Sequence, residues 1–149
     1  MELFHMPQVL AKFKKNRGIE IWVTFGEFQG EERIDIREYF RPDNGPDYHP
    51  TRKGVAIPKK HIVELLDLIE SVIDDDSPGT TKVLELSKSV QIWAGNREYL
   101  NHPYKELRKY VFSKEKGDWN HTHQGITFKS EIARELYKTI EGFLDVIGQ

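Results

Sequence analysis

The sequence lacks cysteine, a long apolar run and an excess of charge of either sign. Without cysteine there can be no disulfide, thiolate nucleophile or cysteine metal site, which suits a reducing compartment. No apolar run approaches the roughly 20 residues of a membrane span, and the first residues do not have the pattern of a signal peptide. We therefore expect no membrane association. The expected location is cytoplasmic or nucleoid-associated, or nuclear in a eukaryote.

The near balance of charge restricts how this protein can bind a polyanion. There are 22 basic and 24 acidic residues, a net charge of −2, which argues against a wholly electrostatic, histone-like DNA binder. Any binding of nucleic acid must therefore come from a local arrangement of cations.

A constant shift of 71 residues aligns the chain with itself without gaps, the mark of a tandem repeat. The shift matches Ile21-Trp22 with Ile92-Trp93, Arg37 with Arg108, Tyr39 with Tyr110, Gly54 with Gly125 and Glu64-Leu65 with Glu135-Leu136. Between the copies lies an acidic run that ends in Pro-Gly, typical of a helix end and a linker. We predict a first unit at residues 1–73, a linker at 74–81 and a second, diverged unit at 82–149.

Each unit has the pattern of four strands and a helix. In the first unit we expect strands at residues 9–15, 19–25, 33–40 and 51–57, followed by a helix that opens at Pro58. The apolar stripe of the second helix is wide, so we expect the helices to pack on each other as well. The predicted fold is α+β: two tandem ββββα units, with curved antiparallel sheets and paired helices, as an intramolecular pseudo-dimer. The linker would also permit a homodimer that exchanges units.

The third strand alternates clearly between apolar and polar residues. Ile34, Ile36 and Phe40 fall on one side. Arg33, Asp35, Arg37 and Tyr39 fall on the other. This pattern predicts a half-buried antiparallel strand with a polar working face.

The segments IDIREYF (residues 34–40) and RKGVAI (52–57) closely resemble the positive cofactor four family of transcriptional coactivators. That family has an IDIREYW-like strand, a loop, a GRKGISL-like strand and a helix. FQG (residues 28–30) is similar to its FKG hairpin. The resemblance covers roughly residues 19–73, and for the second unit it rests mainly on the repeat.

The resemblance implies a fold and a function. Family members are homodimers whose helices form the dimer core and whose sheets bind unwound or single-stranded DNA with little sequence preference. The related Whirly and Pur-alpha architectures have similar uses. We therefore expect a non-catalytic pseudo-dimer that binds single-stranded DNA in transcription or DNA metabolism, with transcription or replication proteins as further partners.

Single strands are bound by cations that follow the phosphates and by aromatic faces that stack on bases. The resemblance assigns stacking to Phe28, Phe40 and Trp22, and phosphate binding to Arg37 and to the pair Arg52 and Lys53. Composition alone adds Lys14 and Lys15.

Several of these residues have a second interpretation. Trp22 and Phe40 are equally compatible with a core position, and Arg37 with a salt bridge to Asp35. Strand alternation places Phe40 opposite Arg37, so a bulge or a strong curl would be needed to bring both to one ligand.

In the second unit the corresponding candidates are Trp93, Tyr99 and Arg108. His123 and Gln124 replace the basic pair. We expect this second groove to bind differently, weakly or not at all.

Other functions have weaker support from the residues. No nucleophile–base arrangement, phosphate loop or paired carboxylates stand out, so we expect no enzyme. His121 and His123 lack a third ligand at a fixed spacing, so we expect no metal and no cofactor. Two alternatives remain open: RNA as the ligand, and a protein-interaction scaffold that has kept the fold and lost the groove.

Overall fold

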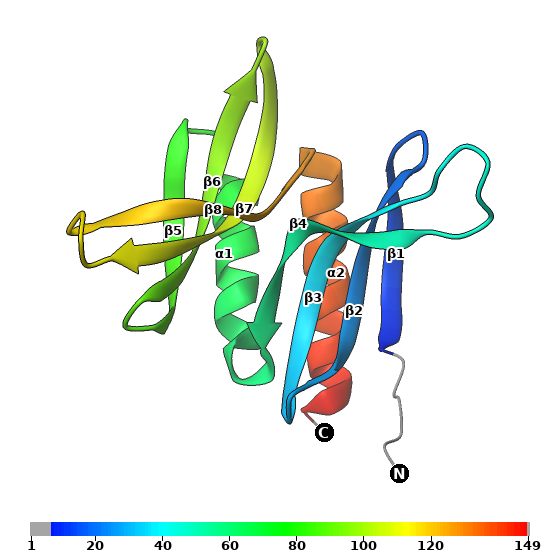
Figure 1. Ribbon diagram of the computed structural model, residues 1–149, viewed down its shortest axis with the longest axis horizontal. Helices are drawn as coiled ribbons and strands as arrows, with labels where there is room; N and C mark the ends of the chain where they lie inside the picture. Colours follow the sequence, from blue (N-terminus) through cyan, green and yellow to red (C-terminus); the bar gives the residue numbers. More distant parts are fainter. Residues whose placement is uncertain (1–6, 149) are drawn as a thin grey trace.

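The computed structural model describes residues 7–148 and contains two four-stranded antiparallel sheets and two helices (Figure 1). The first unit consists of β1 (Gln8–Asn16), β2 (Ile19–Phe28), β3 (Glu31–Phe40), β4 (His49–Pro58), a 3-10 turn (Lys59–His61) and α1 (Ile62–Asp74). The second consists of β5 (Gly79–Ser87), β6 (Val90–Tyr99), β7 (His102–Ser113), β8 (Asp118–Phe128) and α2 (Ser130–Ile147). The predicted tandem ββββα fold is confirmed. No helix within residues 7–148 is long and apolar enough to span a membrane.

Several boundaries differ from the sequence-based expectation, and three of the differences change the assignment of a segment. Pro58 ends β4 instead of opening the helix, because its φ of −56° and ψ of 145° are extended and an edge strand tolerates its missing N–H. Strand β2 continues to Phe28, and a tight turn with positive φ at Gln29 and Gly30 joins it to β3. Strand β5 already begins at Gly79, within the segment predicted as linker.

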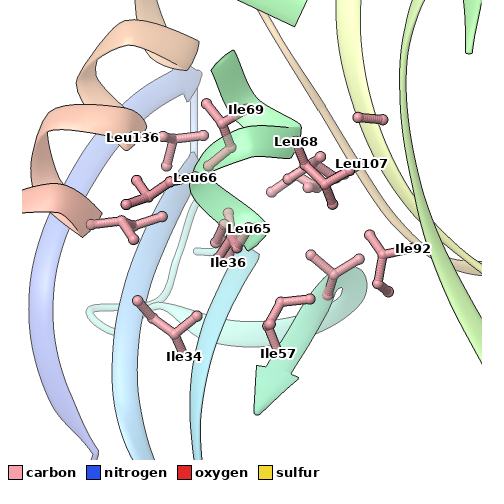
Figure 2. Packing of buried hydrophobic residues seen from close by; sticks show 14 of the residues in the cluster. Ile34, Ile36, Ile57, Leu65, Leu66, Leu68, Ile69, Ile92, Leu107 and Leu136 are labelled. Atoms are coloured by element: carbon pink, nitrogen blue, oxygen red, sulfur yellow. The ribbon is translucent and has the colours of Figure 1, made fainter. Parts of the chain in front are cut away.

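The two units share one hydrophobic core because each helix packs on the sheet of the other unit. Helix α1 contacts β5 and β6, and α2 contacts β1 and α1. Phe143 of α2 packs on Phe25 of β2, with ring centroids 4.7 Å apart. Figure 2 shows Leu65 of α1 beside Ile36 of the first sheet, and Leu68 beside Leu107 of the second. The pairing of the helices is therefore confirmed, and neither unit has a core of its own.

The buried face of α1 is much wider than that of α2. Six side chains of α1 are buried, namely Ile62, Leu65, Leu66, Leu68, Ile69 and Val72. Only Ala133, Leu136 and Ile140 are buried in the longer α2. Helix α1 is thus the central element of the core, between both sheets.

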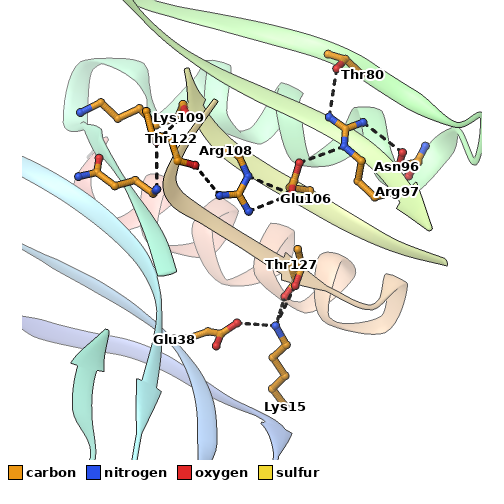
Figure 3. Close-up of polar contacts among 11 residues, drawn as sticks. Lys15, Glu38, Thr80, Asn96, Arg97, Glu106, Arg108, Lys109, Thr122 and Thr127 are labelled. Carbon is orange, nitrogen blue, oxygen red and sulfur yellow. Dashed lines mark hydrogen bonds and ion pairs between the residues drawn. The ribbon is translucent and has the colours of Figure 1, made fainter. Parts of the chain in front are cut away.

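A polar contact fixes the units against each other where β4 packs against β8 (Figure 3). Glu38, only 5% exposed, lies on the inner face of β3 after Ile34 and Ile36. The ammonium of Lys15 donates to Glu38 Oε2 at 2.5 Å and to the carbonyl and hydroxyl oxygens of Thr127 at 2.8 and 3.0 Å. A buried carboxylate is tolerated only with such a partner, so this contact favours one docking of the two units.

The acidic connection between the units is also anchored. Buried Lys105 donates to Asp76 Oδ1 and to Asn96 Oδ1, both at 2.8 Å. The Asn96 amide donates to the carbonyl oxygens of Asp75 and Ser77. The shift of 71 residues pairs Asn96 and Lys105 with the apolar Phe25 and Ile34 of the first unit. Polar side chains therefore hold the connection in the second sheet at the positions where the first sheet is apolar.

We expect Leu68→Ala to lower the free energy of unfolding by about 2–5 kcal/mol, because it leaves a cavity where α1 meets the second sheet. Urea denaturation should show one cooperative transition, since both sheets share α1. The control Val63→Ala, at a position that is 58% exposed on the same helix, should change stability by about 0.5 kcal/mol or less. Two separate transitions would contradict a shared core.

Candidate nucleic-acid interface

A row of outward-facing residues crosses the first sheet. Strand pairing places Lys12 opposite Trp22, Trp22 opposite Arg37 and Arg37 opposite Gly54. The Trp22 ring stacks on Tyr39 at 4.0 Å between centroids, and Lys12 Nζ lies 4.0 Å from the Trp22 ring. Trp22 is therefore an outer-face residue rather than a core residue, and its indole ring contacts both Tyr39 and Lys12.

Arg37 forms a fork between β3 and β4. Its Nε and Nη2 donate to the two carboxylate oxygens of Asp35 at 3.0 and 3.2 Å, and its Nη1 donates to the carbonyl oxygen of Thr51 at 2.9 Å. The salt bridge to Asp35, which was the second interpretation of Arg37, is thus present. Arg37 holds the neighbouring strand in place with the same group that was predicted to bind phosphate.

The strand that Arg37 holds is bulged. Arg37 pairs with Gly54 and Tyr39 with Pro50, so two steps along β3 correspond to four along β4. Such bulges re-aim side chains, and here the exposed Arg52 and Lys53 lie on the bulge. Neither side chain forms an ion pair with any residue from 7 to 148. The bulge lies on β4 and carries the basic pair, so it does not bring Phe40 to the side of Arg37.

Gly54 is needed for the close approach of the two strands. A Cβ at this position would lie 2.7 Å from the carbonyl oxygen of Ile36 and 2.8 Å from the Arg37 Cβ. The glycine between the basic pair and the strand thus makes room for the arginine fork.

The second unit repeats this scaffold. Arg108 donates to Glu106 at 3.2 and 3.1 Å and to the carbonyl oxygen of Thr122 at 2.9 Å (Figure 3). Trp93 stacks on Tyr110 at 3.8 Å. The same register shift in β8 creates a second bulge, but this bulge carries a histidine and a glutamine.

A hollow of about 470 Å³ extends along the outer face of the first sheet. Phe28, 54% exposed, lines one end, and Tyr39 and Pro50 line the other. The guanidinium of Arg33 lies 4.4 Å from the centre of the Phe28 ring. Sequence analysis did not single out Arg33 as a site residue, although its alternation with Arg37 placed it on the polar face.

Burial, aided by the nearby Asp35 carboxylate, raises the pKa of Tyr39, while Arg37 acts in the opposite direction. The phenol in this hollow is therefore neutral at ordinary pH, with its ring against Trp22.

The second sheet has a side chain where the first sheet has space. Arg97 stands at the position that corresponds to Gly26, which lines the first hollow. Its guanidinium donates to Glu106 at 3.1 Å and to the Asn96 carbonyl oxygen at 3.3 Å. The two outer faces therefore share a scaffold and differ in shape.

Both bulges line one cleft of about 600 Å³ between the units. Arg52 and Lys53 lie on one side of it, and Arg108 and His123 lie on the other. Lys15 also lines this cleft, with its ammonium engaged by Glu38 and Thr127.

The remaining predicted residues do not gather in one place. Phe40 is 47% exposed at the end of β3 and follows the inner-face alternation, so it lies neither in the core nor in the outer hollow. Lys14 is exposed on β1 and pairs with Glu20 on β2. Tyr99 is exposed at the end of β6. Among residues 7–148, no group of three or more His, Cys, Asp or Glu side chains could hold a metal ion.

We expect Gly54→Ala to destabilise the protein by about 1–3 kcal/mol, because the new methyl group would collide with backbone and side-chain atoms of β3. The matched control is Gly142→Ala, in helix α2 with open space around it, which should stabilise by about 0.5–1 kcal/mol. Thermal or urea denaturation would measure both, and equal effects would argue against the fork geometry.

Comparison with known proteins finds a family match within the first unit. Residues 15–68 match the family model described as Transcriptional Coactivator p15 (PC4). A Caenorhabditis elegans protein, provisionally named an RNA polymerase II transcriptional coactivator, is 29% identical over 72 residues, with 44% of this chain covered. The chain spans 58% of that relative's length.

Among solved structures, a PC4 homolog from Burkholderia pseudomallei aligns with 44% of this chain and 88% of its own, at 20% identity and a TM-score of 0.38. The family match of residues 15–68 takes in β2, β3, the arginine fork and the bulged β4. The match to the transcriptional coactivator p15 (PC4) family model therefore falls within the first ββββα unit of this chain.

Proposed function

We propose that this protein binds single-stranded DNA with little sequence preference and acts in transcription or DNA metabolism. One observation carries the proposal: between an aromatic hollow and a cleft, the bulge of β4 presents two cations that form no ion pair with any residue from 7 to 148. Pro50, at the start of the bulge, lines the hollow, whereas Arg52 and Lys53 line the cleft. A DNA strand that crosses this bulge would have aromatic rings on one side and positive charge on the other.

The residues would divide the work as the chemistry of single strands requires. Arg52 and Lys53 would contact phosphates, and Phe28 would stack on a base, with Arg33 already over its ring. Arg37 and Arg108 would position the bulges, because their guanidinium groups are occupied by carboxylate and carbonyl oxygens.

Two further predicted residues have conditional roles. Trp22 would offer a ring face to a base after Lys12 left it. Lys14 would supply charge along the outer face of β1, next to this row.

The architecture favours a single strand over a duplex. Bases that stack on rings inside a hollow must first be unpaired, and the net charge of −2 gives little general attraction for duplex phosphates. Stacking platforms accept RNA as well as DNA, so RNA is an arm of the test.

A protein partner is the second candidate function. Glu31 pairs with the exposed Phe28, and Glu27 and Glu32 are the next pair along the hairpin, so these carboxylates would weaken contact with phosphates there. The scaffold hypothesis therefore gains support if nucleic acid does not bind.

The first experiment is a fluorescence-anisotropy titration of labelled oligo-dT of about 25 nucleotides at low and moderate salt, with duplex DNA and oligo-U as competitors. Arg52→Ala/Lys53→Ala should weaken binding and flatten the dependence of log K on log salt by about 0.7 for each lost phosphate contact. Phe28→Ala should cost about 1–3 kcal/mol.

The matched control is Arg134→Ala/Lys138→Ala, which removes the same charge from the exposed side of α2. It should leave affinity and salt dependence nearly unchanged. Absence of wild-type binding at low salt would reject the proposal, and an equal loss in the control would assign the effect to net charge rather than to the bulge.

A further inference from the structure

The β7–β8 hairpin of the second unit differs from its counterpart in the first. Residues 41–48 form a loop between β3 and β4, whereas only residues 114–117 separate β7 from β8. The longer paired strands project from the second sheet, on the side away from the first (Figure 1). Two positions on each of these strands, which correspond to loop positions in the first unit, are therefore paired in the second unit and hold ordered side chains.

These extra positions hold aromatic rings. Strand pairing sets Tyr110 opposite His121 and Phe112 opposite Trp119, and residues two apart on a strand share a face. Phe112 and Trp119 contact edge to face at 5.5 Å, and Tyr110 contacts His121 at 6.4 Å. Together with Trp93, which stacks on Tyr110, these rings form a continuous aromatic ladder on the outer face of the second sheet.

The first unit has a different surface here, in which Tyr48 lies against Trp22 with ring centroids 6.1 Å apart. The repeat pairs Phe112 with Arg41 and Trp119 with Tyr48, and there the guanidinium lies 5.5 Å from the Tyr48 ring. The second unit instead has a ring pair in which Phe112 is 38% exposed and Trp119 is half-buried.

We propose that the aromatic ladder is a second stacking surface, which binds a further stretch of the same single strand. The inference rests on the proposed function and adds a site to it. Neighbouring rings along one strand are about 6.6 Å apart, roughly twice the 3.4 Å rise per nucleotide of a stacked duplex strand. An extended, unstacked strand could therefore set a base on each ring.

The ladder continues the path of the proposed strand. His123 lines the cleft opposite Arg52 and Lys53, and His121 lies two residues along the same bulged strand β8. A nucleic-acid strand that leaves the cleft at His123 would meet the aromatic ladder at His121. On the second sheet, the Arg97 side chain takes the place of the hollow of the first unit, so the nucleic-acid strand meets no equivalent of that site there.

The charges near the ladder indicate binding by stacking rather than by ion pairing. Lys114 and Lys116 are exposed in the turn, beside Glu115. The carboxylate of Asp118 accepts the backbone N–H of Trp119 at 2.8 Å. The turn carries balanced charge, so the ladder should add affinity with little salt dependence. Flat rings next to lysines suit bases and phosphates better than an aliphatic peptide, which needs a contiguous apolar surface.

The test compares two lengths of oligo-dT, about 25 and about eight nucleotides, on the full chain. Phe112→Ala/Trp119→Ala should weaken binding of the long oligonucleotide by about tenfold or more, with the salt slope unchanged. Binding of the short oligonucleotide at the first unit should not change. The control Val63→Ala/Val146→Ala removes exposed apolar surface from the two helices and should have no effect.

Tryptophan fluorescence gives a second readout that does not depend on hairpin stability. The chain has three tryptophans, and two of them already stack on tyrosines. Trp119→Phe should therefore measurably reduce the quenching that oligo-dT causes. Equal affinity in the double variant, or undiminished quenching in Trp119→Phe, would overturn the ladder while the first-unit site stands. Absence of any wild-type binding would overturn both.

Discussion

The arginine fork is the contact on which the candidate surfaces depend. Arg37 binds a carboxylate of its own strand and a carbonyl oxygen of the next, and only a glycine leaves space for it there. A charge-assisted, bidentate contact of this kind defines geometry as well as adding stability. Since the fork recurs at Arg108, one local solution shapes both bulges and thus both walls of the cleft between the units.

The fold was largely predictable from the sequence because its signals are regular. The alternation around Ile34 and Ile36 and the shift that joins Arg37 to Arg108 predict strands and a tandem repeat, and the structure confirms both. The exchange of helices between sheets had no such signal. Packing of α1 on β5 and β6 depends on three-dimensional complementarity of side chains, which periodicity along one helix does not describe.

Side-chain partners were harder to predict than strands. Lys15 looked like a free cation because its partner, Glu38, lies on a different strand at a position that alternation assigns to the core. Arg33 was not predicted as a site residue, because its contact with Phe28 is made across the β2–β3 hairpin. A bulge on β3 would have been needed to bring Phe40 to the side of Arg37, but the extra residues belong to β4. These contacts join residues on different strands, and the binding roles of these residues remain predictions.

The covalent connection between the units has a consequence for symmetry. In a homodimer every substitution appears on both faces, and a two-fold axis makes the two directions along a bound strand equivalent. Here the connection held by Lys105 and Asn96 joins two unequal faces, one with Arg52 and Lys53 and the other with His123 and Gln124. This molecule has no operation that exchanges its faces. A nucleic-acid strand laid across both would meet a different surface at its 5′ end than at its 3′ end, so the scaffold has a polarity that a homodimer of identical units would lack.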